Sequence, residues 1–412
     1  MFGPVQNNML LKMDRTIYKD AAIDVLSDQD VMLFLMGARQ VGKTVLSKSI
    51  ASSYDQSFYL NFDNDEHRKL ILSGQSFIEN IFQTQYVGKK PLIIFDEIHK
   101  YKNWKNFIKG FYDVYKQNYQ MIITGSSRLD VFYKGGDSLM GRYLPYTVHP
   151  FSVGELNPNA MDGLFRPPYS VNKEDWEALY QFGGFPVPFL KRDLKRYKQW
   201  RRMRRAQLFR EDIRDMTHVH EISQLELCAQ LLEYQVGCIL NRSTLGQKLR
   251  ISLPTINRWL EILRQFYFAF TIQPWSRNIP RSLIKEPKVY LNDWSIVSDP
   301  GSRFENFIAC HLKKSIDFWS ESGEGDFELY FLRDKSQREV DFLVTRDQEP
   351  WFLVEAKSSE QRLTSSLAYY QELTKAPFAF QVTKNMPYVD YDCFSKAGIF
   401  IVPAQTFLSQ LV

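Results

Sequence analysis

Short apolar runs and helix-like stretches alternate along the first 150 residues of the chain. The apolar runs are typical of buried strands, and they lie at 30–36, 57–63, 90–96, 119–124 and 142–148. Parallel strands need a crossover connection, usually a helix, so strands that alternate with helices predict a parallel sheet. We therefore expect an α/β domain over residues 1–150.

The rest of the chain changes pattern three times, which predicts a multidomain protein. A helical region with the turn Gly183-Gly-Phe-Pro186 comes first, and two short helices with two strand candidates come next. The last region begins with a helix and continues as strands that carry acids at their ends. The expected boundaries after the first domain are 151–222, 223–298 and 299–412.

Composition and charge narrow the class of protein. No apolar run approaches the roughly 20 residues that span a bilayer, and the first residues lack a secretory pattern. Cys228, Cys238, Cys310 and Cys393 are scattered, as expected of reduced thiols. We therefore expect a cytoplasmic protein that does not insert into membranes.

The positive charge is concentrated in one segment. The formal net charge is +5, whereas residues 191–210 hold ten Lys or Arg and one Asp, a local charge of +9. The remaining chain therefore sums to −4. This distribution predicts contact with a specific acidic surface rather than nonspecific electrostatic binding.

A phosphate-binding loop follows the first predicted strand. The motif G-x-x-x-x-G-K-T consists of Gly37, Ala38, Arg39, Gln40, Val41, Gly42, Lys43 and Thr44. In such a loop backbone N–H groups surround the phosphates, the lysine contacts them, and the threonine hydroxyl binds Mg²⁺. A glycine loop that matches by chance is the alternative, and the flanking strand and helix disfavour it. We expect ATP and Mg²⁺ as ligands.

Two acids end the third predicted strand. Asp96 is placed to hold Mg²⁺ beside the phosphate loop, and Glu97 is placed to polarise the attacking water. The alternative is an ordinary solvated strand end. The pair favours ATP hydrolysis over binding alone.

These residues resemble the AAA+ ATPases. In Thr124-Gly-Ser-Ser-Arg128 the resemblance implies a sensor of the γ-phosphate, with Thr124 or Ser126 as the polar contact. Arg142 matches the finger arginine that reaches a neighbouring subunit, and Arg128 is the alternative for that role. Either could instead be a surface arginine. The resemblance implies a homo-oligomer completed by an arginine in trans.

Two strand candidates near the C-terminus carry acids. Because side chains alternate along a strand, Asp341 shares a face with Glu339, and Glu355 shares one with Lys357. Asp341 and Glu355 would bind Mg²⁺, and Lys357 would orient or deprotonate water for attack on a phosphodiester. A sheet with a salt-bridged polar face is the alternative.

This arrangement resembles the PD-(D/E)xK nuclease superfamily. Asp341 and Glu355-Ala-Lys357 match its core, and Glu305 matches the extra acid that many members carry. Val340 stands where the pattern has a proline. The resemblance implies a restriction-endonuclease-like α/β domain with Glu305, Asp341 and Glu355 as metal ligands and Lys357 as a catalytic residue.

A helix-turn-helix pattern lies between these domains. Helices at 243–250 and 255–264 flank a turn, and strands at 268–275 and 287–292 could form a wing. Four residues are the candidate contacts to nucleic acid: Arg250, Thr255, Asn257 and Arg258. DNA is the expected partner, although winged helices also pack against other domains and the partner could be a protein.

Taken over nearly its whole length, the chain resembles a family of prokaryotic AAA+ ATPases whose C-terminal domain has no settled function. The motifs beyond those above are Gly183-Gly-Phe-Pro186, Phe209-Arg-Glu-Asp-Ile213 and Lys288-Val-Tyr-Leu-Asn-Asp293. The resemblance implies an AAA+ P-loop sheet, a winged helix and a nuclease-like domain, and we expect the region between sheet and winged helix to be a helical lid.

Two functions remain open. The protein could be an ATP-driven enzyme that cuts nucleic acid, or an ATP-gated switch or scaffold whose nuclease-like domain only binds a partner.

Overall fold

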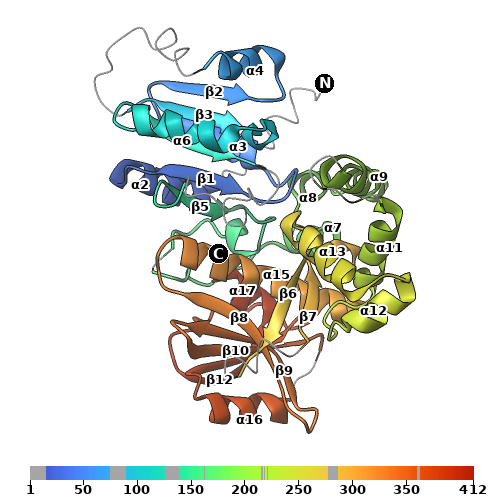
Figure 1. The fold of residues 1–412 in the computed structure, drawn as a ribbon. Helices are drawn as coiled ribbons and strands as arrows, with labels where there is room; N and C mark the ends of the chain where they lie inside the picture. The colour runs from blue at the N-terminus through green and yellow to red at the C-terminus, as the bar shows by residue number, and fades with distance from the viewer. Residues whose placement is uncertain are drawn as a thin grey trace. The chain divides into compact units, whose positions relative to one another are not determined.

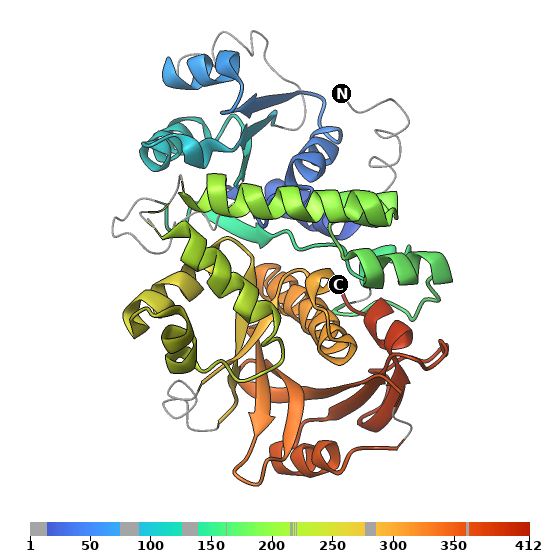
Figure 2. The same cartoon turned by 90° about the vertical axis from the view of Figure 1, so that its right-hand side faces the viewer.

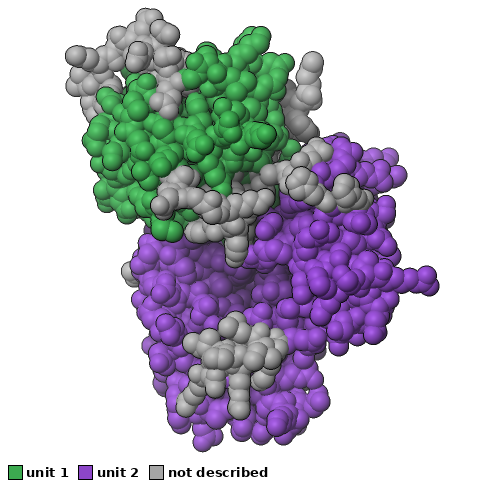
Figure 3. Space-filling view, viewed as in Figure 1, with its two compact units in different colours: residues 1–149 green, residues 150–412 purple. Residues whose placement is uncertain are grey.

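The computed structural model describes residues 15–74, 90–125, 139–161, 163–214, 217, 219, 221–276, 286–359 and 362–412. The chain divides into two compact units, residues 1–149 and 150–412, which Figure 3 colours separately. Within the described ranges no helix is both long and apolar enough to cross a membrane.

In the described part of the first unit, five parallel strands form one sheet in the order β2-β3-β4-β1-β5 (Figure 1). The strands are β1 (Met32–Met36), β2 (Ser57–Asn61), β3 (Leu92–Asp96), β4 (Gln120–Thr124) and β5 (Tyr143–Thr147). All five predicted strands are confirmed, each one or two residues shorter at an end than expected. Strand β4 lies between β1 and β3, so the strand that leads into the glycine loop and the strand that ends at Asp96 are not neighbours.

Helices cover both faces of this sheet, as expected of a parallel α/β domain. They are α2 (Thr16–Asp28), α3 (Lys43–Ala51), α4 (Asp65–Leu72) and α6 (Trp104–Tyr115), with a short 3₁₀ turn η1 (Ile98–Lys100). Helix α6 packs on the face that includes Phe34 and Phe95, and the rings of Phe95 and Phe111 meet edge to face at 5.1 Å. Helix α2 contacts β1, and helix α3 contacts β3 and β4.

The described part of the second unit contains a mixed sheet of seven strands in the order β12-β11-β10-β9-β8-β6-β7. They are β6 (Ala269–Pro274), β7 (Lys288–Leu291), β8 (Phe327–Arg333), β9 (Glu339–Arg346), β10 (Glu349–Lys357), β11 (Phe378–Thr383) and β12 (Gly398–Pro403). The two strands predicted as a wing, β6 and β7, therefore belong to the same sheet as the C-terminal strands. The join is the parallel pairing of Gln273 and Pro274 with Tyr330 and Phe331. The division into four domains stays a prediction.

Helix α15 covers one face of this sheet and α16 the other (Figure 2). The described helices of the unit are α7 (Lys173–Phe182), α8 (Pro186–Lys191), α9 (Leu194–Gln207), α11 (Ile222–Glu233), α12 (Arg242–Leu249), α13 (Leu253–Gln265), α15 (Pro300–Glu321), α16 (Ser365–Thr374) and α17 (Ala404–Ser409). Short turns are η2 (Gly154–Leu156), η3 (Leu208–Ile213) and η4 (Trp294–Ile296). Helices α11, α12 and α13 with β6 and β7 follow the predicted order of a winged helix, but a nucleic-acid role for them stays a prediction.

The helical region that we predicted as a lid packs within the second unit. The Trp294 indole N–H donates to the Leu179 carbonyl at 3.0 Å, and the Tyr197 hydroxyl donates to the Ser295 carbonyl at 3.1 Å. Gly184 is also tightly enclosed, because a Cβ there would lie 2.3 Å from the Phe151 carbonyl oxygen. The Gly183-Gly-Phe-Pro186 turn therefore serves packing inside this unit.

Part of the basic segment is used for internal ion pairs. Arg205 of α9 pairs with Glu226 at 2.9 Å and with Glu233 at 2.7 Å. Arg204 lies 3.6 Å from Asp293 and stacks over the Phe185 ring at 3.9 Å. These two arginines hold α9 to the unit, while contact between the segment and an external acidic surface stays a prediction.

His311 is a buried, neutral histidine in the core of the second unit. Its Nε2 accepts the Val153 N–H at 3.0 Å, so its Nδ1 carries the proton and donates to the Phe307 carbonyl at 2.7 Å. Burial, with a smaller contribution from Lys314, lowers the pKa of His311 to about 3, while the hydrogen bond to Phe307 and the charge of Glu155 oppose the shift. In the unfolded chain the pKa returns to about 6.5.

We expect acid to destabilise the second unit through His311. Between pH 6.5 and pH 3 the unfolded chain binds a proton that the folded state does not, so the free energy of unfolding falls as the pH falls, by about 1.4 kcal/mol per pH unit from this group. Urea unfolding at pH 7, 6 and 5, followed by tryptophan fluorescence, should show a shallower pH dependence for His311→Gln than for wild type. Equal slopes for the two proteins would contradict the prediction.

Candidate functional site

The predicted phosphate loop lies where β1 ends and α3 begins. Gly37 and Gly42 have φ angles of 142° and 105°, which side chains rarely adopt. A Cβ on Gly37 would also lie 2.3 Å from the Val148 carbonyl oxygen. The loop therefore requires glycine at both positions, and its backbone curves around the N-terminus of α3.

Lys43 is held inside this loop. Its side chain is buried, and its ammonium donates to the carbonyls of Gly37 and Ala38, each at 2.9 Å. A buried ammonium within a loop of backbone N–H groups at a helix N-terminus fits a triphosphate, because all of these groups attract anions. The geometry thus fits the predicted nucleotide.

Asp96 is the centre of a hydrogen-bonded network at the end of β3. The Thr44 hydroxyl donates to its Oδ2 at 3.0 Å, and the Thr124 hydroxyl donates to its Oδ1. The structure therefore brings together three residues that the sequence placed in one site. Thr124 can contact Asp96 because β4 lies next to β3. The other candidates in that segment, Ser126 and Arg128, lie outside the described residues.

Tyr59 is a member of this network that the sequence did not reveal. Its hydroxyl donates to Asp96 Oδ2, the oxygen that also accepts from Thr44. Burial, and then the hydrogen bond and charge of Asp96, raise the pKa of Tyr59 above its usual range, so the phenol stays a donor. The only sequence signal was that Tyr59 lies in a predicted strand, since the order of the strands was unknown.

Glu97 has an acceptor oxygen that the protein leaves unused. Its backbone is left-handed, with φ of 57°, and its buried Oε2 has no hydrogen-bond partner among the described residues. The nearest cationic or imidazole groups to this oxygen are Lys100 Nζ at 3.6 Å and His99 Nε2 at 3.7 Å. Burial raises the pKa of Glu97, while Lys43 and Lys100 oppose that shift. This arrangement fits a carboxylate that accepts a proton or a hydrogen bond from a water.

Arg142 lies at the opposite edge of the same sheet. It directly precedes β5, at the edge where the parallel strands begin, whereas the phosphate loop follows the carboxyl end of β1. Its Nε lies 2.9 Å from Asp113 Oδ1 on α6. Arg142 therefore does not contact the candidate nucleotide site of its own chain, and a role in trans stays a prediction.

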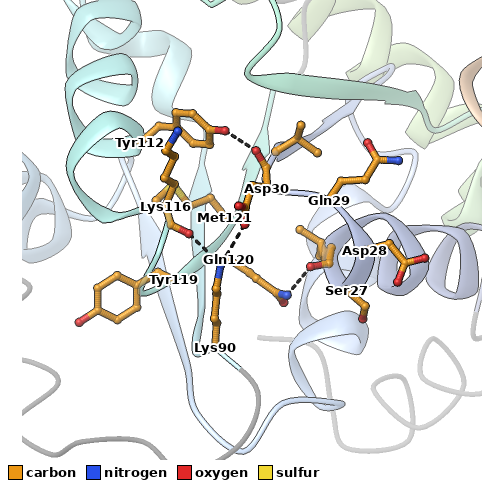
Figure 4. Close-up of a pocket in the computed structure, with 12 residues that line it drawn as sticks. Ser27, Asp28, Gln29, Asp30, Lys90, Tyr112, Lys116, Tyr119, Gln120 and Met121 are labelled. Atoms are coloured by element: carbon orange, nitrogen blue, oxygen red, sulfur yellow. Dashed lines mark hydrogen bonds and ion pairs between the residues drawn. The ribbon is translucent and has the colours of Figure 1, made fainter.

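A cavity of about 380 Å³ lies at this edge as well (Figure 4). Lys90 Nζ is 3.0 Å from Asp30 Oδ1, and the Tyr112 hydroxyl donates to the Asp30 carbonyl. These contacts link the segment that precedes β1 to the segment that precedes β3 and to α6.

In the second unit the predicted nuclease residues converge. Glu355 and Lys357 of β10 form an ion pair at 2.8 Å, and the Ala356 N–H donates to Asp341 Oδ2 at 2.9 Å. The Asp341 N–H donates to Glu355 Oε2 at 3.4 Å. Glu305 of α15 joins the group through shared partners. We call Glu305, Glu339, Asp341 and Glu355 the carboxylate cluster.

A buried lysine lies within the carboxylate cluster. Lys288 Nζ is 2.6 Å from Glu339 Oε1, 3.2 Å from Glu305 Oε1 and 3.7 Å from Asp341 Oδ1. The Tyr290 hydroxyl adds a hydrogen bond to Glu305 Oε1 at 2.7 Å. The sequence placed Lys288 in the wing and did not connect it with the acids.

These contacts argue against the predicted metal site. Among the described residues no group of three His, Cys, Asp or Glu side chains is arranged to hold a metal ion. An ammonium group within contact distance of three of the four carboxylates supplies the charge that a cation would otherwise bring. As arranged, Glu305, Asp341 and Glu355 do not fit a divalent ion, so the geometry of the cluster gives no support to metal-dependent cleavage.

Burial and mutual repulsion perturb the titration of the cluster. They raise the pKa of Glu305 and of Glu355 to about 7, with Asp341 as the neighbouring charge in both cases. Burial alone would lower the pKa of Lys288, but Glu305, Asp341 and Glu339 together raise it above its usual range. Lys288 is therefore a stable cation.

The candidate nucleic-acid residues lie on and before α13. Arg250, Asn257 and Arg258 are exposed, and Thr255 is bound to Ser252 through its hydroxyl at 2.9 Å. Thr255 thus takes part in the N-terminal cap of α13, while the two arginines and Asn257 face solvent. The wing residues between 277 and 285 lie outside the described residues.

Comparisons with known proteins agree with the first unit. Residues 29–157 match a family model described as an AAA domain. Residues 173–299 and 300–406 match two models described as domains of unknown function, DUF8612 and DUF4143. The last description assigns no activity, so the resemblance to nucleases stays a prediction.

Two curated relatives are the uncharacterized proteins Mb2031c of Mycobacterium bovis and Rv2008c of Mycobacterium tuberculosis. Each is 20% identical over 344 residues, which covers 77% of this chain and 71% of the relative. A solved structure that is similar to this chain is the Walker-type ATPase PABY2304 of Pyrococcus abyssi, with 16% sequence identity and a TM-score of 0.45. The match covers 69% of this chain and 94% of the Pyrococcus chain. Residues 29–157 thus match a family model described as an AAA domain, and the geometry of the phosphate loop within them fits a nucleotide.

Proposed function

We propose that the protein hydrolyses ATP with Mg²⁺ and that this hydrolysis controls the binding of nucleic acid by the second unit. The observation that carries the proposal is the network in which Thr44 and Thr124 both donate to Asp96, next to the loop-held ammonium of Lys43. Such a network positions a carboxylate and a hydroxyl on one side of a phosphate loop, as nucleotide hydrolysis requires.

Each residue has a distinct role in the proposal. The loop and Lys43 would bind the β- and γ-phosphates, and Thr44 and Asp96 would hold Mg²⁺, which neutralises charge on the phosphates when bound. Glu97 would orient the attacking water through its unused Oε2. Thr124 would sense the γ-phosphate, since it shares the Asp96 carboxylate with Thr44.

For the second unit, one observation favours binding over cleavage. The ammonium of Lys288 contacts Glu305, Glu339 and Asp341, so these carboxylates already have a cation. This supports the second candidate function, an ATP-gated switch whose nuclease-like domain binds a partner without cutting it. DNA is the proposed partner, and a protein partner is the alternative.

The test is ATP turnover with and without single-stranded, duplex or branched DNA, with Lys43→Ala as the inactive control. Turnover that depends on Lys43 and rises with one of these DNAs supports the proposal. ATP turnover that is the same with and without each of these DNAs would contradict coupling to DNA. Cleavage of DNA by the wild-type protein that is lost in Lys357→Ala would instead support the nuclease function.

We expect Arg258→Ala to weaken DNA binding by about tenfold, because each phosphate contact from an exposed arginine contributes roughly 1 kcal/mol or more. Arg264→Ala on the same helix is the matched control, because Arg264 is held by Glu261 at 2.7 and 2.6 Å. Electrophoretic mobility shift at two salt concentrations measures both variants. Equal affinities for Arg258→Ala and wild type would argue against α13 as the contact surface.

A further inference from the structure

We infer that the Lys288 ammonium is the resident cation of the carboxylate cluster and that it excludes a divalent metal from the place between Glu305 and Asp341. The inference concerns the second unit alone and does not depend on ATP hydrolysis.

Lys288 reaches the cluster from the buried side. It is the first residue of β7, is 2% exposed, and its ammonium bridges α15 and β9 through Glu305 and Glu339. Its Nζ also lies 5.5 Å from the centre of the Phe331 ring on β8. Helix α15 contacts β7, β8 and β9, so it lies over all three of these strands. Because the lysine is enclosed by three elements, it cannot leave the cluster without opening the packing.

The carboxylate oxygens of the cluster are nearly all engaged. In the described structure seven of the eight carboxylate oxygens face a donor. Lys288 contacts Glu305 Oε1, which also accepts from Tyr290, and it contacts one oxygen each of Glu339 and Asp341. The other oxygens of Glu339 and Asp341 face Arg333 and the Ala356 N–H, and the two of Glu355 face Lys357 and the Asp341 N–H. The eighth, Glu305 Oε2, is packed against Gly237, where a Cβ would lie 2.8 Å away.

A divalent cation would need several of these oxygens at once. Mg²⁺ takes about six oxygen ligands at roughly 2.1 Å in near-octahedral geometry, which requires carboxylate lone pairs that face one point. The ammonium lies within 3.7 Å of three of the four carboxylates and would repel a dication placed among them. Removal of the Lys288 charge, with its side-chain volume kept, should therefore expose a divalent site.

Lys357 differs from Lys288 in this respect. Its side chain is 36% exposed and, within the described part of the chain, forms its ion pair only with Glu355, so it can move aside into solvent. Lys288 and Tyr290 share one side of β7 because they are two residues apart, and both contact Glu305. The resident cation is thus built into the motif Lys288-Val-Tyr290 rather than supplied by the predicted catalytic lysine.

The experiment is a calorimetric titration with Mn²⁺ alone, without nucleotide, in an Asp96→Asn background that silences the candidate metal ligand of the first unit. Four full-length proteins are compared: the background itself and the same chain with Asp341→Asn, Lys288→Met, or both substitutions. We expect the background and Asp341→Asn to bind Mn²⁺ equally weakly. Lys288→Met should bind one Mn²⁺ per chain at least about tenfold more tightly, and the added Asp341→Asn should remove that gain.

Two results would overturn the inference. One is a saturable Mn²⁺ site in the background protein that disappears in Asp341→Asn, since Lys288 would then coexist with a metal. The other is a folded Lys288→Met protein that gains no Mn²⁺ site. If Lys288→Met does not fold, the comparison of the background with Asp341→Asn still decides, because equal binding supports the exclusion and unequal binding refutes it. A failure of the ATPase proposal would leave all of these results unchanged.

Discussion

Glu97→Gln is expected to lower the ATP turnover number by about 100-fold to 10,000-fold while nucleotide binding persists. A positioned general base or water-orienting carboxylate contributes a factor of this size, and glutamine keeps the shape of the side chain without its basicity. Glu97 is the group to change because its buried Oε2 has no hydrogen-bond partner among the described residues, and its ion pair with Lys100 is long, at 3.6 Å.

The measurement separates chemistry from binding. Steady-state phosphate release gives turnover, and equilibrium titration with a fluorescent ATP analogue gives affinity. Lys43→Ala is the contrasting variant, since removal of its ammonium should abolish both quantities. Turnover in Glu97→Gln within tenfold of wild type would show that another group activates the water.

The candidate nucleotide site was largely predictable because its parts are local in sequence. The glycine loop, Lys43 and Thr44 are consecutive, and Asp96 with Glu97 ends a strand whose apolar residues are visible as a run. Thr124 was predicted from the resemblance to AAA+ ATPases as one of two sensor candidates, with Ser126, and it lies at the carboxyl end of β4 beside β3.

Tyr59 and Lys288 were missed because their partners are distant in sequence. Tyr59 reaches Asp96 since β2 is the neighbour of β3, and only the sheet order reveals this. Lys288 reaches Asp341 since β6 pairs with β8 and draws its hairpin partner β7 into the C-terminal sheet. A wing predicted from helix-turn-helix spacing gives no reason to expect that pairing, because the sequence pattern of an edge strand does not identify its neighbour.

Arg142→Ala is expected to reduce ATP turnover by about 1,000-fold if the arginine completes the site of a neighbouring copy, which is the typical contribution of an arginine supplied in trans. The structure provides a control for the alternative explanation, in which the loss of turnover comes only from the loss of the contact between Arg142 and Asp113. Arg142 pairs with Asp113 at 2.9 Å, so Asp113→Asn removes the charge of this ion pair but leaves the guanidinium in place. Asp113→Asn should retain turnover near the wild-type value.

Mixing the inactive variants then tests the direction of the contact. Arg142→Ala keeps its own phosphate loop, and Lys43→Ala keeps its arginine, so a mixed assembly contains interfaces in which both functional groups meet. Each variant alone should be inactive, and the mixture should recover turnover because Arg142 lies at the edge of the sheet away from its own loop. Loss of activity in Asp113→Asn as well as Arg142→Ala, with no recovery on mixing, would assign Arg142 to the stability of the α6–β5 contact instead.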